Sequence, residues 1–472
     1  MKKTITNYKV LFFICLTVGT LYSQNIKKQE MLNTTQFHDS NNRVFIPQGF
    51  VANTHVSGKR LDYTPADYQQ MQRYGANFQV IRVGLGKLGG WHGFKLDPTY
   101  LDQIDAMISN AANVGIKTGI KLVVYDVKEF KTNGWTKLWE NKNNEQELLV
   151  SAWENLWKRY KNNPNVFCYD LLNEPKLGDI ENTTVLEKNI LAPLYQKLID
   201  KLHTIDTNKW ACFQPIHTEP TNVVFCPFAP WQTPLNRDKI IYAPHIYEGR
   251  LDIIPKRLDK YIQEAKVSNA KLMLGEWGPA IRNDWDTNFF LQINCKNVYE
   301  RTCREVDARA IGTVKAWFTG TPHWVGKEKN ATWAIFKDKK QLGTNERKYI
   351  MDFLCRAHPL FVSGKLKNFG FDFANRKFTM NYIPQSNSAP TEIYVPVNRH
   401  YPDGFRLKIN DKEVFELKVS PDSPSGLLPK LIESNRKIEW QPWAQRLLIF
   451  EDSTNSKQKK LEICPGFTRL EN

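Results

Sequence analysis

The sequence lacks the cysteine and histidine spacings that build structural metal sites. Its 472 residues include 8 cysteines and 9 histidines, but they form no CxxC repeat and no mixed cluster with zinc spacing. We therefore expect no metal site. The spacing is compatible with a disulfide between Cys212 and Cys226 or between Cys295 and Cys303, but connectivity cannot be read from a sequence.

Long apolar runs are missing after the first 23 residues. Lysines precede an apolar stretch over residues 10–21, and Ser23 follows it closely, which is the layout of a cleaved secretory signal. The stretch is shorter than the roughly 20 residues of a membrane span. Leu16 follows Cys15, so the small residue of a lipoprotein signal is absent and a lipid anchor is not expected. We expect a signal peptide over 1–23 and a secreted or periplasmic protein with no transmembrane segment.

Basic residues are numerous but not concentrated. The net charge is +16, and the only small basic run is Lys457-Gln458-Lys459-Lys460. A positive excess favours acidic partners through the long-range field, whereas nucleic-acid binding needs basic residues gathered on one element. We expect no nucleic-acid partner. The basic run is interpreted first as a solvated tail, and second as a patch for anionic glycolipids or membrane surfaces.

The chain does contain a regular alternation of short apolar runs and longer amphipathic stretches. In one such stretch Asp97-Pro98 precedes Leu101, Ile104 and Ile108, which have helical spacing. Eight apolar runs separated by helical patterns predict an α/β fold, a (β/α)8 TIM barrel over residues 24–358. The predicted strands are Val44–Val51, Phe78–Val83, Thr118–Val124, Val166–Leu172, Trp210–Pro215, Lys239–Ala243, Lys271–Leu274 and Gly312–Phe318.

The pattern changes after residue 358. Runs such as Lys377–Tyr382, Glu392–Val397 and Phe405–Ile409 alternate apolar and polar residues and are separated by Pro, Asn, Asp and Gly. This alternation is typical of antiparallel strands with one buried face. We therefore predict a small C-terminal antiparallel β-sandwich domain over residues 359–472.

Two glutamates follow predicted barrel strands. Glu174 comes after the fourth apolar run and Glu276 after the seventh. The carboxyl ends of barrel strands meet at one face, so these two side chains can approach each other. Cleavage of a glycosidic bond with retention needs two carboxyl groups of unlike protonation about 5 Å apart. We expect Glu174 to be the acid/base, with a raised pKa, and Glu276 to be the ionised nucleophile.

Polar and aromatic residues follow other predicted strands. Arg82 can keep Glu276 charged, and the Tyr247 hydroxyl can donate to the same carboxylate. Asn173 can bind the sugar 2-hydroxyl, while His245 can orient Glu174 or a water molecule. The expected substrate-binding set is Arg82, Asn173, His245, Tyr247, Trp317, which offers a flat face for a pyranose, and the loop residues His55 and Asp126.

Each of these residues has an ordinary structural interpretation when taken alone. Asn-Glu-Pro is a common start of a helix, and Glu276 could be an acidic residue at a helix N-terminus. Arg82 could pair on the surface, and His245 could be a satisfied core histidine. Glu219, in Thr218-Glu219-Pro220, imitates the first motif without its asparagine, and we interpret it as a loop residue. The coincidence of several such residues at successive strand ends favours catalysis.

Three blocks carry a resemblance to a known family. Asn173-Glu174-Pro175, His245-Ile246-Tyr247 and Gly275-Glu276-Trp277-Gly278 resemble the signatures of glycoside hydrolase family 5, the cellulase-type retaining β-glycosidases. Their order and separations match as well. The resemblance implies a (β/α)8 fold with no cofactor over most of residues 44–318.

The tail resembles one branch of that family. His358–Gly364, Phe371–Phe373 and Pro390–Pro396 are similar to the C-terminal β-sandwich of endoglycoceramidases, which implies cleavage between an oligosaccharide and its ceramide. One departure is that many members carry a histidine on the third strand in an Asp-x-His type sequence, whereas this chain reads Val123-Val124-Tyr125-Asp126-Val127-Lys128. The departure leaves the expected mechanism intact, but the resemblance does not predict how the sugar next to the scissile bond is recognised.

The expected function is retaining endo-β-glycosidase activity on glycosphingolipids or related β-glycosides. The expected partners are a glycolipid or oligosaccharide substrate and, peripherally, lipid surfaces or micelles. A polysaccharide endoglucanase or mannanase would share every catalytic residue and is the first rival. A non-catalytic glycan-binding barrel is the second, and the presence of both glutamates disfavours it.

Overall fold

The computed structural model describes residues 30–53, 63–218, 227–279, 281–282, 289–316, 323–325, 328–337, 345–385, 388–419, 426–434, 436–451 and 457–466. The predicted signal peptide lies outside these residues, as do His55, Glu219 and Trp317. Predictions that concern them stay predictions. Within the part that is described, no helix is both long enough and apolar enough to cross a membrane.

Eight parallel strands close into a barrel, as predicted. Each strand pairs with the next one along the chain, and the last pairs with both its predecessor and the first, which completes the cylinder. The strands are short and buried along nearly their whole length, as expected for a barrel covered by helices. They are β3 (Gln48–Asn53), β4 (Phe78–Gly84), β5 (Lys117–Val123), β6 (Val166–Asp170), β7 (Trp210–Phe213), β8 (Ile240–Tyr242), β10 (Lys271–Trp277) and β12 (Gly312–Lys315).

The first predicted strand is not one continuous strand in the structure. The run Val44–Val51 is divided into β2 (Val44–Phe45) and β3, with Ile46-Pro47 between them. Proline has no backbone N–H and cannot donate to a strand ladder. Only the second piece joins the barrel, whereas β2 pairs with a strand of the C-terminal domain.

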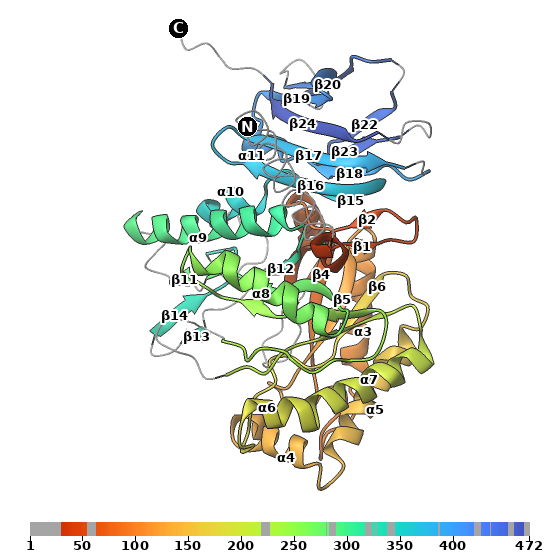
Figure 1. Ribbon diagram of the computed structural model, residues 1–472, viewed down its shortest axis with the longest axis vertical. Helices are drawn as coiled ribbons and strands as arrows, with labels where there is room; N and C mark the ends of the chain where they lie inside the picture. The colour runs from red at the N-terminus through yellow and green to blue at the C-terminus, as the bar shows by residue number, and fades with distance from the viewer. Residues whose placement is uncertain are drawn as a thin grey trace, which may run out of the picture.

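Helices surround the barrel (Figure 1). The predicted helix after Asp97 is α3, and the Asp97 carboxylate caps it by accepting from the backbone N–H of Thr99 and Tyr100. The indole rings of Trp153 and Trp157 stack on the buried face of α5. The helices are α2 (Pro65–Arg73), α3 (Pro98–Ala112), α4 (Gly134–Glu140), α5 (Glu145–Arg159), α6 (Thr183–Leu186), α7 (Ala192–Ile205), α8 (Ile253–Val267), α9 (Phe289–Ala308) and α10 (Lys348–Leu354), with a 3₁₀ turn over Lys128–Lys131 and a π turn over Glu187–Leu191.

The C-terminal part is built from two six-stranded antiparallel sheets with an apolar core. One sheet has the order β1 (Phe37–His38), β2, β15 (His358–Val362), β18 (Thr391–Tyr394), β23 (Arg446–Ile449), β22 (Ile438–Gln441). The other has the order β16 (Gly364–Asp372), β17 (Lys377–Pro384), β24 (Lys459–Pro465), β19 (Gly404–Ile409), β20 (Lys412–Val419), β21 (Leu427–Leu431). The predicted antiparallel architecture is thus confirmed. The predicted boundary between residues 358 and 359 stays a prediction, since β1 and β2 come from the other side of it.

The basic run near the C-terminus is not a solvated tail. Lys459 opens β24, which pairs with both β17 and β19, and its ammonium forms an ion pair with Glu451. Lys460 forms ion pairs with Asp411 and Glu462. Pairing with acidic neighbours inside a sheet neutralises these charges, so the first interpretation of the run was wrong.

The C-terminal domain packs against the amino-terminal end of the barrel (Figure 1). Its contacts come from residues that precede barrel strands: Asn77, just before β4, donates to the carbonyl of Leu360, and Tyr394 donates to the carbonyl of Arg73. The Phe45 and Phe361 rings stack with centroids 5.3 Å apart. Catalytic residues of such barrels lie at the opposite, carboxyl-terminal face. The site below is accordingly built from barrel residues.

Candidate active site

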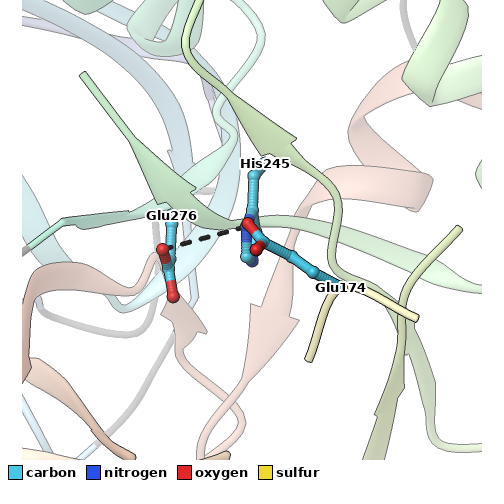
Figure 2. Close-up of side chains that lie close together, drawn as sticks. All are labelled: Glu174, His245 and Glu276. Carbon is cyan, nitrogen blue, oxygen red and sulfur yellow. Dashed lines mark hydrogen bonds and ion pairs between the residues drawn. The ribbon is translucent and has the colours of Figure 1, made fainter. Parts of the chain in front are cut away.

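Glu174 and Glu276 meet at the carboxyl end of the barrel (Figure 2). Glu174 lies just beyond β6, Glu276 lies on β10, and His245 comes from the short strand β9 (His245–Ile246). One carboxylate oxygen of each glutamate and one ring nitrogen of His245 all lie within 4.8 Å of one another. Retaining glycosidases hold their carboxyl groups about 5 to 5.5 Å apart and inverting ones about 6.5 to 9.5 Å. The observed separation matches the retaining geometry.

The backbone holds Glu174 in an uncommon conformation. Its φ is +47°, in the left-handed region that non-glycine residues rarely adopt. The backbone N–H of Glu174 donates to Oε1 of Gln214 at 2.9 Å, and Nε2 of Gln214 donates to Oδ2 of Asp170 at 2.8 Å. Such strain persists only where surrounding contacts enforce it, and it is common at functional sites. The side chain of Glu174 remains 15% exposed, so it is accessible from solvent.

Glu276 is surrounded by donors and positive charge. The Tyr247 hydroxyl donates to Oε2 at 2.5 Å, and the Lys121 ammonium donates to Oε1 at 3.0 Å. Burial raises the pKa of this carboxyl. The charge of Lys121, that of His245 when its ring is positive, the charge of Arg82 and the Tyr247 hydrogen bond lower the pKa by more, to well below its usual range. Glu276 is therefore ionised at neutral pH, as a nucleophile requires.

The glycine that precedes Glu276 is required by close packing. A Cβ on Gly275 would lie 2.8 Å from the carbonyl oxygen of Ala243 and 3.3 Å from the His245 ring. Any larger residue would push β10 away from β9 and separate Glu276 from His245. This close packing therefore explains why a glycine precedes Glu276 in the motif.

His245 bridges the two halves of the site and is fully buried. Its Nδ1 lies 2.8 Å from Oε1 of Glu174, and its Nε2 lies 2.9 Å from the Lys121 ammonium. An ammonium only donates, so Nε2 must accept and the ring proton must reside on Nδ1. A proton on Nε2 would point at the ammonium only 2.9 Å away, where no acceptor lies. The ring therefore donates from Nδ1 to Glu174.

The pKa of Glu174 differs from the expectation. Burial raises this pKa, but the hydrogen bond and the charge of His245 lower it more, to about 2, despite Glu276, which raises it. The predicted rise of the Glu174 pKa is therefore wrong. Because part of the lowering requires a positive ring, the protonation of Glu174 depends on what keeps His245 neutral.

Asn173 and Arg82 lie beside an unexpected tyrosine, Tyr125. Nδ2 of Asn173 donates to the Tyr125 hydroxyl at 3.0 Å, and that hydroxyl lies 3.5 Å from Oε2 of Glu174. The Arg82 guanidinium lies over the Tyr125 ring, 5.0 Å from its centroid. The Tyr125 side chain is 48% exposed, so an aromatic ring beside Glu174 is accessible to a ligand.

Some predicted site residues lie elsewhere. Asp126 accepts the backbone N–H of Lys87 at 2.8 Å, so its carboxylate holds the loop after β4 rather than contacting the glutamate pair. Three tryptophans in the segments after β4 and β5 are buried: Trp91, Trp135 and Trp139. Trp135 and Trp139 lie on α4, and their rings stack with centroids 5.5 Å apart.

Sequence reasoning missed four residues that contact the pair or its supports: Lys121, Tyr125, Asp170 and Gln214. Lys121 and Asp170 carried a signal. Each is a charged residue inside an apolar run that was predicted to be a buried strand, and a buried charge must find a partner. Gln214 and Tyr125 carried no comparable signal.

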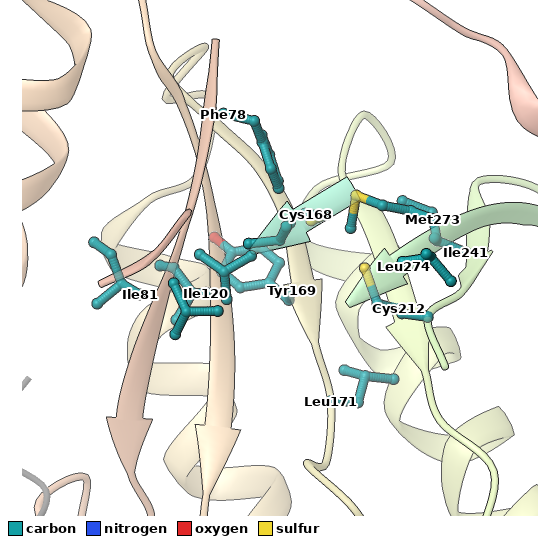
Figure 3. Packing of buried hydrophobic residues seen from close by; sticks show 14 of the residues in the cluster. Phe78, Ile81, Ile120, Cys168, Tyr169, Leu171, Cys212, Ile241, Met273 and Leu274 are labelled. Carbon is teal, nitrogen blue, oxygen red and sulfur yellow. The ribbon is translucent and has the colours of Figure 1, made fainter. Parts of the chain in front are cut away.

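Apolar side chains occupy earlier positions of the same strands (Figure 3). Ile120 precedes Lys121, and Cys168 and Cys212 lie in this core as free thiols. Cys295 and Cys303 cannot form a disulfide with each other, because they lie 8 residues apart on α9, roughly 12 Å along the helix axis. That possible pairing is therefore excluded, and the other stays untested because Cys226 lies outside the described residues.

The three-residue set of Glu174, His245 and Glu276 also contains the ligand types that divalent cations use. Two fixed cations oppose such binding. The Lys121 ammonium contacts both Glu276 and His245, and the Arg82 charge acts on both glutamates. The charge that a metal would neutralise is already balanced by the protein.

Replacing Tyr247 by Phe should weaken the nucleophile and move the acidic limb of the pH profile. A hydrogen bond to a charged group contributes about 1.5 to 3 kcal/mol, so kcat/KM should fall roughly 10- to 100-fold. The bond favours the ionised form, so its loss raises the pKa of Glu276. Activity needs the ionised carboxylate and is lost as the pH falls through its pKa. The acidic limb should therefore lie about one to two pH units higher than in the wild type.

Measurement of kcat/KM against pH on an aryl β-glycoside tests this expectation. The matched control is Tyr160→Phe, which removes a tyrosine bond to the carboxylate of Asp105 between outer helices. An unchanged acidic limb in Tyr247→Phe would contradict the assigned contact.

Comparisons with known proteins agree with this geometry. Curated relatives include endoglycoceramidase I from Rhodococcus hoagii (strain 103S), which is 25% identical over 311 residues, covering 60% of this chain and 55% of that protein. The chain spans about half the length of the curated relatives it matches. Identity at this level gives the relationship but does not carry over the activity of the whole relative.

Solved structures of endo-glycoceramidase II from Rhodococcus sp. share the fold. Its lactosyl-enzyme intermediate has a TM-score of 0.67 at 17% identity, and its ganglioside GM3 complex has 0.66 at 18%. Each alignment covers 91% of this chain and 99% of the other. At such identity the likeness establishes the architecture alone.

Family models match both parts of the chain. Residues 356–428 match the glycoside hydrolase family 5 C-terminal domain, and residues 38–345 match the cellulase model of glycosyl hydrolase family 5. The second match covers more than half of the chain, and it contains all the residues of the glutamate pair and its supports. The chain therefore belongs to glycosyl hydrolase family 5 and is a glycoside hydrolase.

Proposed function

We propose that this glycoside hydrolase is a retaining endo-β-glycosidase that cleaves the bond between the glycan and the ceramide of glycosphingolipids. The observation that carries the mechanism is the pair of carboxylates within 4.8 Å in unlike surroundings. Glu276 is held by an ammonium and a phenol, whereas Glu174 is held by one imidazole. Unlike environments let two carboxyl groups take opposite protonation states.

In the first step Glu276 attacks the anomeric carbon while Glu174 gives its proton to the glycosidic oxygen. The bond between that carbon and oxygen breaks, the ceramide leaves as an alcohol, and an ester joins the glycan to Glu276. Oε1 of Glu174 is engaged by His245, so the transferred proton resides on Oε2, the oxygen nearer Tyr125. Asn173 is placed to bind the sugar 2-hydroxyl.

In the second step Glu174, now a carboxylate, takes a proton from water. The water oxygen attacks the anomeric carbon, the ester breaks, and Glu276 is released as a carboxylate. Two inversions at the same carbon give net retention, so the released glycan keeps the β configuration. Glu174 regains its proton from the water and the cycle closes without a cofactor.

Two observations support a substrate with a lipid part: exposed apolar residues near the glutamate pair, and the names of the relatives. Phe94 and Leu96, in the loop after β4, are 42% and 36% exposed, and Tyr125 is 48% exposed. A Cβ on Gly86 would lie 2.7 Å from the Phe94 ring and 3.1 Å from Asp126, which places Phe94 beside the loop of Tyr125. Exposed apolar groups near a polar catalytic pair suit an amphiphilic ligand and peripheral contact with a micelle or lipid surface.

A product screen tests the substrate. The protein is incubated with glucosyl-, galactosyl- and lactosylceramide in detergent and, separately, with soluble β-glucan and β-mannan, and products are identified by mass spectrometry. We expect intact glycan and free ceramide from at least one glycolipid, with little release of reducing ends from the polysaccharides. Cleavage of polysaccharide alone would favour the endoglucanase or mannanase alternative.

A further inference from the structure

The Lys121 ammonium, which holds Glu276, has further contacts that the two catalytic steps leave unexplained. Lys121 lies on β5 and is fully buried. It sits in register with Arg82 on β4 and with Asp170 on β6, so three charged residues lie side by side at one level of the barrel. A charge buried this deeply costs free energy unless it is paired, and its contacts show how it is paired.

The Lys121 ammonium contacts both halves of the site. It lies 3.0 Å from Oε1 of Glu276, 2.9 Å from Nε2 of His245, 3.4 Å from Oδ2 of Asp170 and 3.3 Å from the carbonyl oxygen of Gly275. His245 in turn donates to Glu174. A continuous chain of hydrogen bonds thus runs from one catalytic carboxylate to the other through Lys121 and His245.

Asp170 gives this arrangement a second counter-ion. When Glu276 becomes an ester, it loses its negative charge, and Asp170 remains to balance Lys121. Asp170 also accepts from Gln214, which fixes the backbone of Glu174. The same charged pair therefore supports the position of the acid/base as well as the nucleophile, and does so throughout the cycle.

We propose that Lys121 is a positioning residue that links the nucleophile to the acid/base. Its ammonium holds Glu276 and, by donating to Nε2, keeps the His245 ring neutral, so that Glu174 can carry the proton that the leaving group requires. The inference rests on the proposed two-carboxylate mechanism but not on the identity of the lipid. The titratable and charged groups around Lys121 on the surrounding elements are Arg82, Asp170, Cys212, His245 and Glu276, with Glu174 one step further away through His245.

The test is Lys121→Met, assayed as kcat/KM against pH on a series of aryl β-glycosides. Without the ammonium, Nε2 of His245 can accept a proton, and the positive ring then holds Glu174 as a carboxylate. We expect the alkaline limb, which reports the proton on Glu174, to move to lower pH by about one unit or more. The acidic limb should move to higher pH because Glu276 loses a cation. Poor leaving groups should lose more activity than good ones.

A second readout follows the ring directly. In protein with ¹⁵N-labelled histidine, with His245 assigned by comparison with His245→Asn, the wild type should show one ring proton, on Nδ1. In Lys121→Met, Nε2 should also become protonated near neutral pH. The control is Lys209→Met, which removes another buried lysine that donates to the carbonyl of Val166 at 2.9 Å, near the amino-terminal start of β6. That variant should leave both limbs and the ring unchanged.

The outcomes separate this proposal from the proposed function. Turnover by Glu276→Gln would overturn the two-carboxylate mechanism itself. An inactive Glu276→Gln together with a Lys121→Met that keeps the wild-type alkaline limb and ring protonation would overturn the role of Lys121 alone. If Lys121→Met does not fold, the double variant Lys121→Met/Asp170→Asn removes both charges of the pair and is measured in its place. A doubly protonated ring in the wild type at neutral pH would also refute the proposal.

Discussion

Replacing Glu276 by Gln should abolish turnover while leaving the fold intact. The amide has nearly the shape of the carboxylate. Its oxygen can still accept from Lys121 while its NH2 group donates to the Tyr247 hydroxyl oxygen, but it cannot form the glycosyl ester. Loss of a covalent nucleophile lowers kcat by roughly 10⁵-fold or more. The measurement is kcat on an aryl β-glycoside and on a glycosylceramide, together with the thermal unfolding midpoint. Retention of most of the activity would refute the nucleophile assignment.

The chain supplies a closely matched control in Glu264. This glutamate is also buried and also accepts a hydrogen bond from a tyrosine, Tyr242, but it lies on α8 outside the barrel. Glu264→Gln should keep activity close to that of the wild type. A further check is Glu276→Gly with added azide, which should form the α-glycosyl azide, since the small anion attacks from the face that Glu276 vacates.

Glu174→Ala should separate substrates by their leaving groups. A ceramide alkoxide needs a proton to depart, so kcat/KM on glycosylceramides should fall about 10²- to 10⁴-fold. A dinitrophenyl glycoside needs no proton, and its kcat/KM should fall less than about tenfold. The ratio kcat/KM covers only the steps up to and including the first irreversible one. It therefore reports acid catalysis and does not include the later hydrolysis of the ester. Equal losses on both substrates would count against the acid role.

The control for this variant lies at the same face of the barrel. Glu129 is in the loop after β5, is partly exposed and forms an ion pair with Lys137 at 2.8 Å. Glu129→Ala should show the leaving-group dependence of the wild type. Added azide should restore turnover of the dinitrophenyl substrate by Glu174→Ala, and the product should be the β-glycosyl azide, because azide then attacks the glycosyl ester from the side of Glu174.

The placement of the C-terminal domain limits its part in this chemistry. It contacts the barrel through residues that precede β3 and β4, at the end away from the glutamates. Just before β15, Arg356 forms a buried ion pair with Asp307 on α9. Changes in that domain should therefore act on stability and only indirectly on catalysis.

The barrel strands and the two strand-end glutamates were predictable from the sequence for a local reason. Buried parallel strands require continuous apolar runs, and the residue after such a run lies at a known face of a barrel. The predicted strand over Val44–Val51 failed at Pro47, although proline is itself a local signal. The basic run at Lys457–Lys460 failed because its partners, including Glu451 and Asp411, come from other segments of the chain.

The sequence by itself determined the barrel, the antiparallel tail and the positions of Glu174 and Glu276 along the chain, since those features follow from short-range patterns. The tertiary structure alone decided which groups surround each carboxylate. Strand register brings Lys121 beside Asp170, and closure of the barrel brings Lys121 to Glu276 and His245, which are more than 100 residues away in the chain. A pKa depends on distances of a few ångströms between such groups, so protonation states could be assigned only after the barrel had closed.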